Sequence, residues 1–351
     1  MNVPKLRFGE FFANKWNNKQ LVNICDMRAG KFVRASEING DFDEGLYPCY
    51  GGDGLRGFTK SFTHEGKHSL IGRQGALCGN VTLAINKFHA TEHAVVVSAS
   101  EGVSTDWLFY ALGRLNLNQY ATGQAQPGLS VENLEKVELS ISDSEKEQQK
   151  IADFLSAVDE KITALTAQKT ALTQYKQGMM QRIFAQTLRF KDDNGADYPE
   201  WEEMRLGDLL DYEQPTKYLV SSTDYQDDYP IPVLTAGKTF ILGYTDEQGG
   251  IFTNLPVIIF DDFTTANKFV NFPFKAKSSA MKMLKNDPTN SNLRFIYETM
   301  QLLDFATGDE HKRYWISEYQ EQFIFVPCLE EQTKIAQFLT ELDNKINAVD
   351  A

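Results

Sequence analysis

Apolar side chains recur in steps of four and three along two stretches of this chain. The apolar positions are Ile151, Leu155, Val158, Ile162 and Leu165 in the first stretch, and Ile335, Leu339, Leu342, Ile346 and Val349 in the second. Steps that average 3.5 residues place these positions on one narrow stripe of an α-helix, as in a coiled coil. We therefore predict a long helix at each stretch. Because a long helix with a narrow seam needs a partner, the seam packs either on its own domain or on the other helix.

The two seams belong to a repeat of about half the chain. The phrase "EQQKIADFLSAVDEKI" begins at Glu147, and "EQTKIAQFLTELDNKI" begins at Glu331, which lies 184 residues later (331 − 147). Further pairs keep nearly the same shift: Trp16 with Trp201, "RGFT" with "LGYT", and "YATG" with "FATG". A period this long indicates duplication of a whole domain. Since both copies keep the same seam, we favour packing of the two helices on each other.

Each copy also contains a globular part with mixed secondary structure. The short apolar runs "HSLIGR", "NVTLAI", "AVVVSA", "LPVIIF" and "QFIFVP" predict strands, and glycine-rich stretches such as "YGGDGLRG" predict turns between them. The runs "STDWLFYALGRLNL" and "SNLRFIYETMQLL" have helical spacing. The predicted fold is mixed α+β: two globular domains joined by long antiparallel coiled-coil helices, with an internal pseudo-two-fold repeat.

The repeat sets the predicted domain boundaries. Residues 1–143 form the first globular domain, 144–187 the first long helix, 188–328 the second domain and 329–351 the second helix. The second helix stops at the last residue and is about 20 residues shorter than the first. Ser144 followed by Glu147 predicts a capping box at the start of the first helix.

Composition narrows the class of protein without naming it. The 351 residues are 42% hydrophobic but contain no apolar run of 18, so we expect no membrane span. The four cysteines have no metal-type spacing, and the first residues lack the apolar core of a signal peptide. We expect a cytoplasmic protein that needs no cofactor.

The net charge of −13 is uneven along the chain. Residues 1–140 carry 14 basic and 14 acidic groups, whereas residues 201–328 carry 11 and 19. Bulk charge therefore argues against binding to nucleic acid. Two local basic clusters still allow local contacts with nucleic acid: Lys275, Lys277, Lys282 and Lys285, and Lys312 with Arg313.

One known family has this order of motifs. A domain that opens on a tryptophan is followed by Leu129, Ser130 and Leu134, and then by the phrase from Glu147 to Ile162. The stretches "VPKLRF" and "TLRFKDDNGADYPEW" complete the pattern. The chain resembles the specificity subunit of type I restriction–modification systems over essentially its whole length.

The resemblance implies a non-catalytic subunit. In that family each globular domain is a target-recognition domain that reads one half of a bipartite site in double-stranded DNA. The helices set the distance between the halves and dock methyltransferase subunits, two of which are expected here. Restriction subunits attach through the methyltransferase. Because the tips of the two copies differ, we expect an asymmetric target.

Side-chain chemistry suggests which residues contact DNA, and family knowledge does not assign them. Arg and Gln read the edges of guanine and adenine, whereas Lys, Ser and Thr hold phosphates. The candidates are Arg56, Arg73, Gln74, Gln124 and Gln126 in the first domain, and Lys238, Thr239, Asn267, Lys268, Lys312, Arg313 and Tyr314 in the second.

Two short stretches partly match enzyme motifs, but the surrounding sequence argues against both. His89, Glu92 and His93 match a zinc-protease pattern that belongs on a helix, but the surrounding residues predict strands and a turn. "AGKT" ends like a phosphate loop but has Pro232 where the leading glycine is needed. We therefore predict no metal site and no catalytic residue. Two alternatives stay open: the recognition subunit of a related system that cleaves and methylates through another polypeptide, and a coiled-coil scaffold that binds no DNA.

Overall fold

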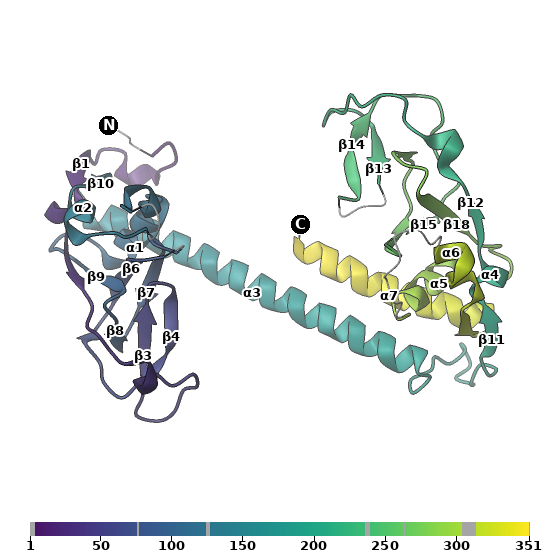
Figure 1. Ribbon diagram of the computed structural model, residues 1–351, viewed down its shortest axis with the longest axis horizontal. Helices are drawn as coiled ribbons and strands as arrows, with labels where there is room; N and C mark the ends of the chain where they lie inside the picture. The colour runs from purple at the N-terminus through teal and green to yellow at the C-terminus, as the bar shows by residue number, and fades with distance from the viewer. Residues whose placement is uncertain are drawn as a thin grey trace. The chain divides into compact units, whose positions relative to one another are not determined.

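The computed structural model describes residues 4–75, 77–123, 127–235, 239–262, 264–303 and 314–350 (Figure 1). The chain divides into two units, which we call unit 1 (Met1–Ala164) and unit 2 (Leu165–Ala351). Each unit is described by itself.

Unit 1 is built from short strands, two short helices and the first part of a long helix. Its elements are β1 (Trp16–Gln20), β2 (Cys25–Ala29), β3 (Tyr47–Gly51), β4 (Gly54–Thr59), β5 (His64–Glu65), β6 (His68–Gly72), β7 (Val81–Ala84), β8 (Lys87–Ala90), β9 (Ala94–Ala99), α1 (Thr105–Arg114), α2 (Val131–Glu135), β10 (Glu138–Ser142) and α3 (Glu145–Phe184). The strands form sheets of order β2-β9-β6-β7 and β4-β3-β8-β5, and a β1-β10 pair.

Unit 2 has the second part of α3 and a comparable series of elements. They are β11 (Glu202–Arg205), α4 (Leu206–Leu209), β12 (Asp211–Glu213), β13 (Ile231–Leu234), β14 (Ile241–Thr245), β15 (Val257–Asp261), β16 (Asn267–Val270), β17 (Lys275–Ala276), β18 (Met281–Lys285), α5 (Leu293–Met300), α6 (Tyr314–Ser317), β19 (Phe323–Val326) and α7 (Leu329–Asp350). The sheets are β12-β18-β15-β16, β14-β13-β17 and β11-β19.

The two units repeat one topology. The order β12-β18-β15-β16 in unit 2 reproduces β2-β9-β6-β7 in unit 1, and β14-β13-β17 reproduces β4-β3-β8. In both units the central strand of the second sheet pairs in parallel with a strand that lies later in the chain: Cys49 pairs with His89, and Val233 pairs with Lys275. The predicted mixed α+β class and the predicted repeat are confirmed. So are the strands and helices that the apolar runs predicted.

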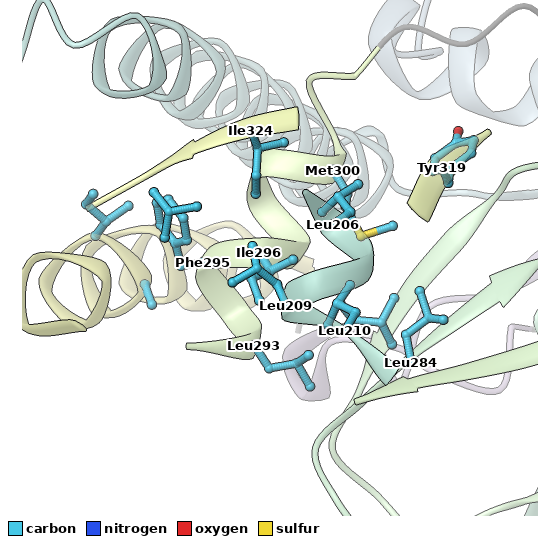
Figure 2. Close-up of a cluster of buried hydrophobic side chains, with 14 of the residues drawn as sticks. Leu206, Leu209, Leu210, Leu284, Leu293, Phe295, Ile296, Met300, Tyr319 and Ile324 are labelled. Atoms are coloured by element: carbon cyan, nitrogen blue, oxygen red, sulfur yellow. The ribbon is translucent and has the colours of Figure 1, made fainter. Parts of the chain in front are cut away.

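Each unit has its own apolar core. In unit 1, Trp16, Trp107 and Leu112 are buried together with the inner faces of β2 and β9. Figure 2 shows the corresponding cluster of unit 2, in which leucines of α4 gather with side chains of α5 and with Ile324 of β19. Full burial of one such side chain stabilises a fold by about 1.5–3 kcal/mol, so each unit holds together through many such contributions.

The distal half of α3 packs antiparallel against α7 within unit 2 (Figure 1). The Lys169 ammonium lies 2.7 Å from the Asp350 carboxylate, and that of Lys176 lies 2.8 Å from Asp343. Residues later in α3 thus pair with residues earlier in α7, so the two helices run antiparallel. This confirms the predicted antiparallel packing. Beneath these pairs, Met180 and Ile183 are buried against Ile335, Leu339 and Leu342. Within the described ranges, no helix has an apolar stretch long enough to cross a membrane.

The two seams differ in burial. Ile335, Leu339 and Leu342 are buried and Ile346 and Val349 are half-buried. On α3, by contrast, Ile151, Leu155 and Leu165 are half-buried, while Val158 is 39% and Ile162 is 56% exposed. The register explains the difference within unit 2. Since Lys169 faces Asp350, α7 lies along residues of α3 that come after position 169.

The glutamate of the repeated Glu-Gln pair binds an arginine and a tryptophan near the start of each globular part. Glu147 is 1% exposed; its Oε1 lies 2.7 Å from the Arg7 guanidinium and accepts from the Trp16 indole N–H at 3.3 Å. The second copy repeats this: Glu331, fully buried, lies 2.8 Å from Arg189 and accepts from Trp201 at 3.1 Å. In both copies, the glutamate thus binds the arginine of an "LRF" stretch and the tryptophan that follows it.

The glutamine of the pair caps a second helix. The amide oxygen of Gln148 accepts from Ser104 N at 2.9 Å, where Ser104 is the N-cap of α1. The amide oxygen of Gln332 accepts from Asn292 N at 2.8 Å, at the N-cap of α5. The predicted capping box is half correct. Glu147 N donates to Ser144 Oγ at 3.4 Å, but the Glu147 carboxylate binds Arg7 and Trp16 instead of the helix end.

Candidate nucleic-acid interface

Four segments of unit 1 meet at one place, which we call junction 1: residues 51–54 between β3 and β4, 73–75 after β6, 91–93 before β9, and 127–129. Arg73 N donates to His93 O at 2.9 Å, and Leu129 N donates to Arg73 O at 2.8 Å. A Cβ added at Gly72 would lie 2.1 Å from Gly52 O, so only glycine permits this approach of the turn to β6. Junction 1 is thus a fixed platform of backbone.

Arg73 holds this platform together. Its Nε donates to Leu129 O at 3.2 Å, and a terminal nitrogen donates to Glu92 O at 3.5 Å. The side chain is half-buried. Two backbone contacts from one guanidinium make Arg73 a positioning residue in this structure, with part of its fork still accessible for a further acceptor.

Arg56 is exposed and lies at the same junction. Its side chain covers Gly51, where an added Cβ would lie 2.4 Å from Arg56 Cδ. Burial raises the pKa of the Cys49 thiol, with Arg56 lowering it and Glu92 raising it, so both charges act on the same strand end. Unlike Arg73, Arg56 presents its guanidinium to solvent.

Gln74 is exposed at the centre of junction 1. Its Oε1 lies 2.8 Å from His93 Nδ1, and since an amide oxygen can only accept, Nδ1 is the donor. The backbone of Gln74 forms an antiparallel bridge with Gly128. The structure therefore brings together three of the predicted residues of the first domain: Arg56, Arg73 and Gln74.

Gln124 and Gln126, also predicted, lie outside the described residues. The positions that flank them are joined to each other: Thr122 N donates to Gly128 O at 2.9 Å, and Gly128 N donates to Thr122 O at 2.9 Å. Together with the Gln74–Gly128 bridge, these bonds hold Thr122 and Gly128 at junction 1.

In unit 2, the position equivalent to Arg73 holds the carboxylate of Asp262 instead of a guanidinium. Asp262, which follows β15, donates its N–H to Ala280 O at 3.3 Å, as Arg73 does to His93. Its Oδ1 accepts from Trp315 N at 3.0 Å, and its Oδ2 lies 3.3 Å from the Lys282 ammonium. Tyr314 N donates to Asp262 O at 3.3 Å. We call this set junction 2. Sequence reasoning missed Asp262, because only strand pairing aligns it with Arg73.

Among the predicted residues of the second domain, Thr239, Asn267 and Lys268 are described by the structure and do not lie in one place. Thr239 is exposed in the turn before β14, and its carbonyl accepts from Thr235 Oγ1 at 2.7 Å. Asn267 and exposed Lys268 are on β16, in the other sheet, where Asn267 Oδ1 accepts from Gln301. Lys238, Lys312 and Arg313 lie outside the described residues.

Tyr314 is a core residue in this structure. Its side chain is 2% exposed and belongs to the apolar cluster of unit 2. An aromatic ring at the start of α6 buries apolar area there, which outweighs the surface role that its basic neighbours suggested. We therefore do not retain Tyr314 among the proposed DNA contacts.

The residues of the zinc-like motif have other partners. His89 is buried, with Nδ1 3.1 Å from Ser61 Oγ and Nε2 3.1 Å from Lys31 O. Across the described ranges, no three His, Cys, Asp or Glu side chains are placed to hold a metal ion.

At the position of His89, unit 2 has buried Lys275, whose ammonium lies 2.8 Å from Glu247. The hydrogen bond from Lys275 and one from Ser222 N lower the pKa of Glu247 to about 2. The two units therefore satisfy one buried position with different polar pairs, and neither pair resembles a zinc site.

Comparison with known proteins matches both halves of the chain to one family. A family model described as the type I restriction modification DNA specificity domain matches residues 13–174 and again residues 198–350. The EcoR124I/EcoR124II specificity subunit of Escherichia coli is 54% identical over 148 residues, which are 41% of this chain and 36% of that protein. The EcoprrI specificity subunit of the same organism is 44% identical over 159 residues, 45% of this chain and 38% of that protein. The matched parts are thus less than two fifths of these two relatives.

Two matches extend over nearly the whole chain. A specificity subunit of Haemophilus influenzae, named as putative, is 22% identical over 347 residues, covering 94% of this chain and 87% of that protein. The crystal structure of the S subunit of a type I restriction-modification system from M. genitalium has the same fold, with a TM-score of 0.75 at 17% identity. It covers 99% of this chain and 94% of that one.

Proposed function

Because this chain belongs to the family of type I restriction modification DNA specificity domains, we propose that it is the DNA-reading, non-catalytic subunit of a type I restriction–modification complex. The observation that carries the proposal is the doubled fold. Two units share one strand order but differ in the side chains at equivalent positions, as Arg73 and Asp262 do. Two copies of one fold with different exposed side chains suit a protein that recognises two different DNA half-sites.

Each unit reads one half of a bipartite site in this proposal. Junction 1 contributes Arg56 and Gln74 to one half, with Arg73 holding the platform and Gln124 and Gln126 retained as predicted contacts. Unit 2 contributes Thr239, Asn267 and Lys268, with Lys238, Lys312 and Arg313 retained as predicted contacts. Guanidinium and amide groups contact base edges, and lysine and threonine contact phosphates.

The long helices provide the spacing. α3 is one uninterrupted helix of 40 residues, or about 60 Å at 1.5 Å per residue. Two readers held by a stiff element sample half-sites at a fixed separation, as in other two-fold DNA-binding proteins. In this proposal α3 and α7 also dock the methyltransferase subunits, and restriction subunits join through them. The complex and the DNA sites are expected in the cytoplasm.

The net charge of −13 fits a subunit that relies on partners for backbone affinity. Affinity for the DNA backbone scales with the phosphates that lysine and arginine neutralise. In unit 2 the cations of Lys275 and Lys282 are buried in ion pairs with Glu247 and Asp262, which removes them from phosphate binding. We expect the isolated chain to bind DNA weakly.

Long-read sequencing of methylated genomic DNA tests this function. Cells that express the chain with its methyltransferase should carry one asymmetric, bipartite methylated motif, which disappears when the gene for this chain is deleted. A scaffold that binds no DNA would leave the methylated motif unchanged on deletion. The purified chain alone should neither cut nor methylate DNA, and turnover by it would contradict a non-catalytic role.

A further inference from the structure

We propose that His93 positions the side chain of Gln74 so that its amide reads a base in the half-site of unit 1. This inference rests on the proposed function and assigns a role to His93, which the sequence marks only as part of the zinc-like motif. His93 Nδ1 donates to Gln74 Oε1 at 2.8 Å, and on the other side of the ring Glu92 Oε1 lies 3.2 Å from His93 Nε2. The second contact is an ion pair when both ring nitrogens carry a proton.

The amide of Gln74 is exposed and ready to donate. Among the described residues, its Nε2 has no hydrogen-bond partner, whereas one lone pair of its Oε1 is used by His93. A glutamine side chain free in solvent loses up to about 2 kcal/mol of rotamer entropy when a ligand orders it. A side chain already ordered by His93 avoids part of that loss. Its N–H groups suit an acceptor in the major groove, such as guanine O6 or N7.

The backbone under Gln74 is fixed independently of its side chain. The Gln74–Gly128 bridge and the Arg73–His93 hydrogen bond hold it on either side. His93 is thus the only contact among the described residues that orients the end of this side chain. Removing the imidazole of His93 should therefore change the orientation of the Gln74 amide and leave the backbone of residues 73–75 in place.

The fold does not need this pair, because unit 2 builds the same junction without it. Ala280 occupies the position of His93: Asp262 N donates to Ala280 O, as Arg73 N donates to His93 O. A histidine used only to close the loop would be expected in both copies. Its presence in one copy fits a residue that serves one reader.

The test uses the complete complex and the methylated motif. Gln74→Ala and His93→Ala should both relax the same single base pair of one half-site. The expected loss of discrimination there is about 5- to 150-fold for Gln74→Ala and smaller for His93→Ala. The double variant should be no worse than Gln74→Ala, because the two residues act as one unit. His93→Asn, which keeps an N–H near the position of Nδ1, should restore part of the discrimination.

Gln119→Ala is the matched control, since Gln119 is an exposed glutamine whose amide donates to the nearby backbone carbonyl of Leu115 at 2.9 Å. It should leave the motif unchanged. A Gln74→Ala effect without any His93→Ala effect, or effects at different base pairs, would overturn the inference. So would a His93→Ala chain that fails to fold, since the pair would then be structural. If both variants leave the motif unchanged while other changes in unit 1 alter one half-site, the inference fails and the proposed function stands.

Discussion

Single residues explain why the chain contains one sixteen-residue phrase twice. In each copy the glutamate of the phrase is buried and bound by an arginine and a tryptophan that precede it by at least 130 positions. Burial is the largest influence on the pKa of Glu147 and raises it. The hydrogen bonds from Ser142, Arg7, Trp16 and Asn14 outweigh burial, so that the pKa lies below its ordinary value of 4.5. The glutamate of the phrase thus joins the start of a long helix to its globular part. The phrase occurs twice because the domain occurs twice.

Glu147→Gln should destabilise unit 1 and leave unit 2 unaffected. The substitution leaves Arg7, 7% exposed, without its counter-charge, and breaking a buried ion pair costs about 3–5 kcal/mol. Hydrogen exchange in the complete chain should accelerate in peptides that contain β1 and β10. Glu331→Gln is the matched variant and should accelerate exchange in β11 and β19. Equal acceleration in both units from either variant would show that the contacts of the glutamate are not local to one unit.

The effect of Glu147→Gln should also depend on pH. Because the folded pKa of Glu147 is lowered, its ionised form contributes stability that is present above the ordinary carboxyl pKa and is lost as the pH falls through the folded pKa. The difference in exchange between wild type and Glu147→Gln should therefore be largest near neutral pH and shrink below pH 4.5. A difference that grows on acidification would contradict the assigned sign.

At the scale of elements, the sequence predicted periodic structure well and side-chain environment less well. The runs "AVVVSA" and "LPVIIF" become β9 and β15 because local apolar spacing fixes strand and helix identity. Tyr314 and Asp262 were beyond such reasoning, since burial and strand-end pairing depend on segments far apart in the chain. His93 was singled out only through the zinc-like motif. Its place opposite Arg73 follows from the antiparallel pairing of β6 with β9, in which Gly72 is opposite Ala94, and the sequence alone does not give that pairing.

The burial of the seam residues was likewise only partly predictable from the sequence. The heptad pattern correctly indicated a packed face on α7, but it could not say which part of α3 covers it. That depends on the register set by Lys169 with Asp350 and by Lys176 with Asp343.

Leu339→Ala should therefore cost much more stability than Val158→Ala. Leu339 is fully buried against the distal part of α3, and truncating such a leucine costs about 2–5 kcal/mol. Val158, at 39% exposure, buries far less apolar area that truncation could remove. Hydrogen exchange at increasing urea concentration measures both losses, followed in α7 for Leu339→Ala and in the first part of α3 for Val158→Ala. Similar destabilisation by the two variants would mean that Val158 is packed in solution.

At the scale of the whole molecule, the proposed function has two readers that share one helical spacer. Inserting one heptad after Lys161, where the described side chains of α3 are exposed, adds about 10 Å of helix with a turn of only about 20°. At 3.4 Å per base pair, the spacer of the methylated motif should lengthen by about three base pairs. A two-residue insertion rotates one end by about 200° and should abolish methylation. A motif with an unchanged spacer after the heptad insertion would rule out α3 as the ruler.

The division of reading between the two units is best tested with two double variants in the complete complex, by sequencing the methylated DNA. Arg56→Ala with Gln74→Ala removes two proposed base contacts of unit 1, and Asn267→Ala with Arg313→Ala removes two proposed base contacts of unit 2. We predict that each pair relaxes or weakens recognition in one half of the motif only, that the halves differ, and that the spacer stays the same. Removing one base-reading side chain should cost about 1–3 kcal/mol of discrimination. Changes to both halves by one pair, or to the same half by both pairs, would contradict the assignment of one half-site to each unit.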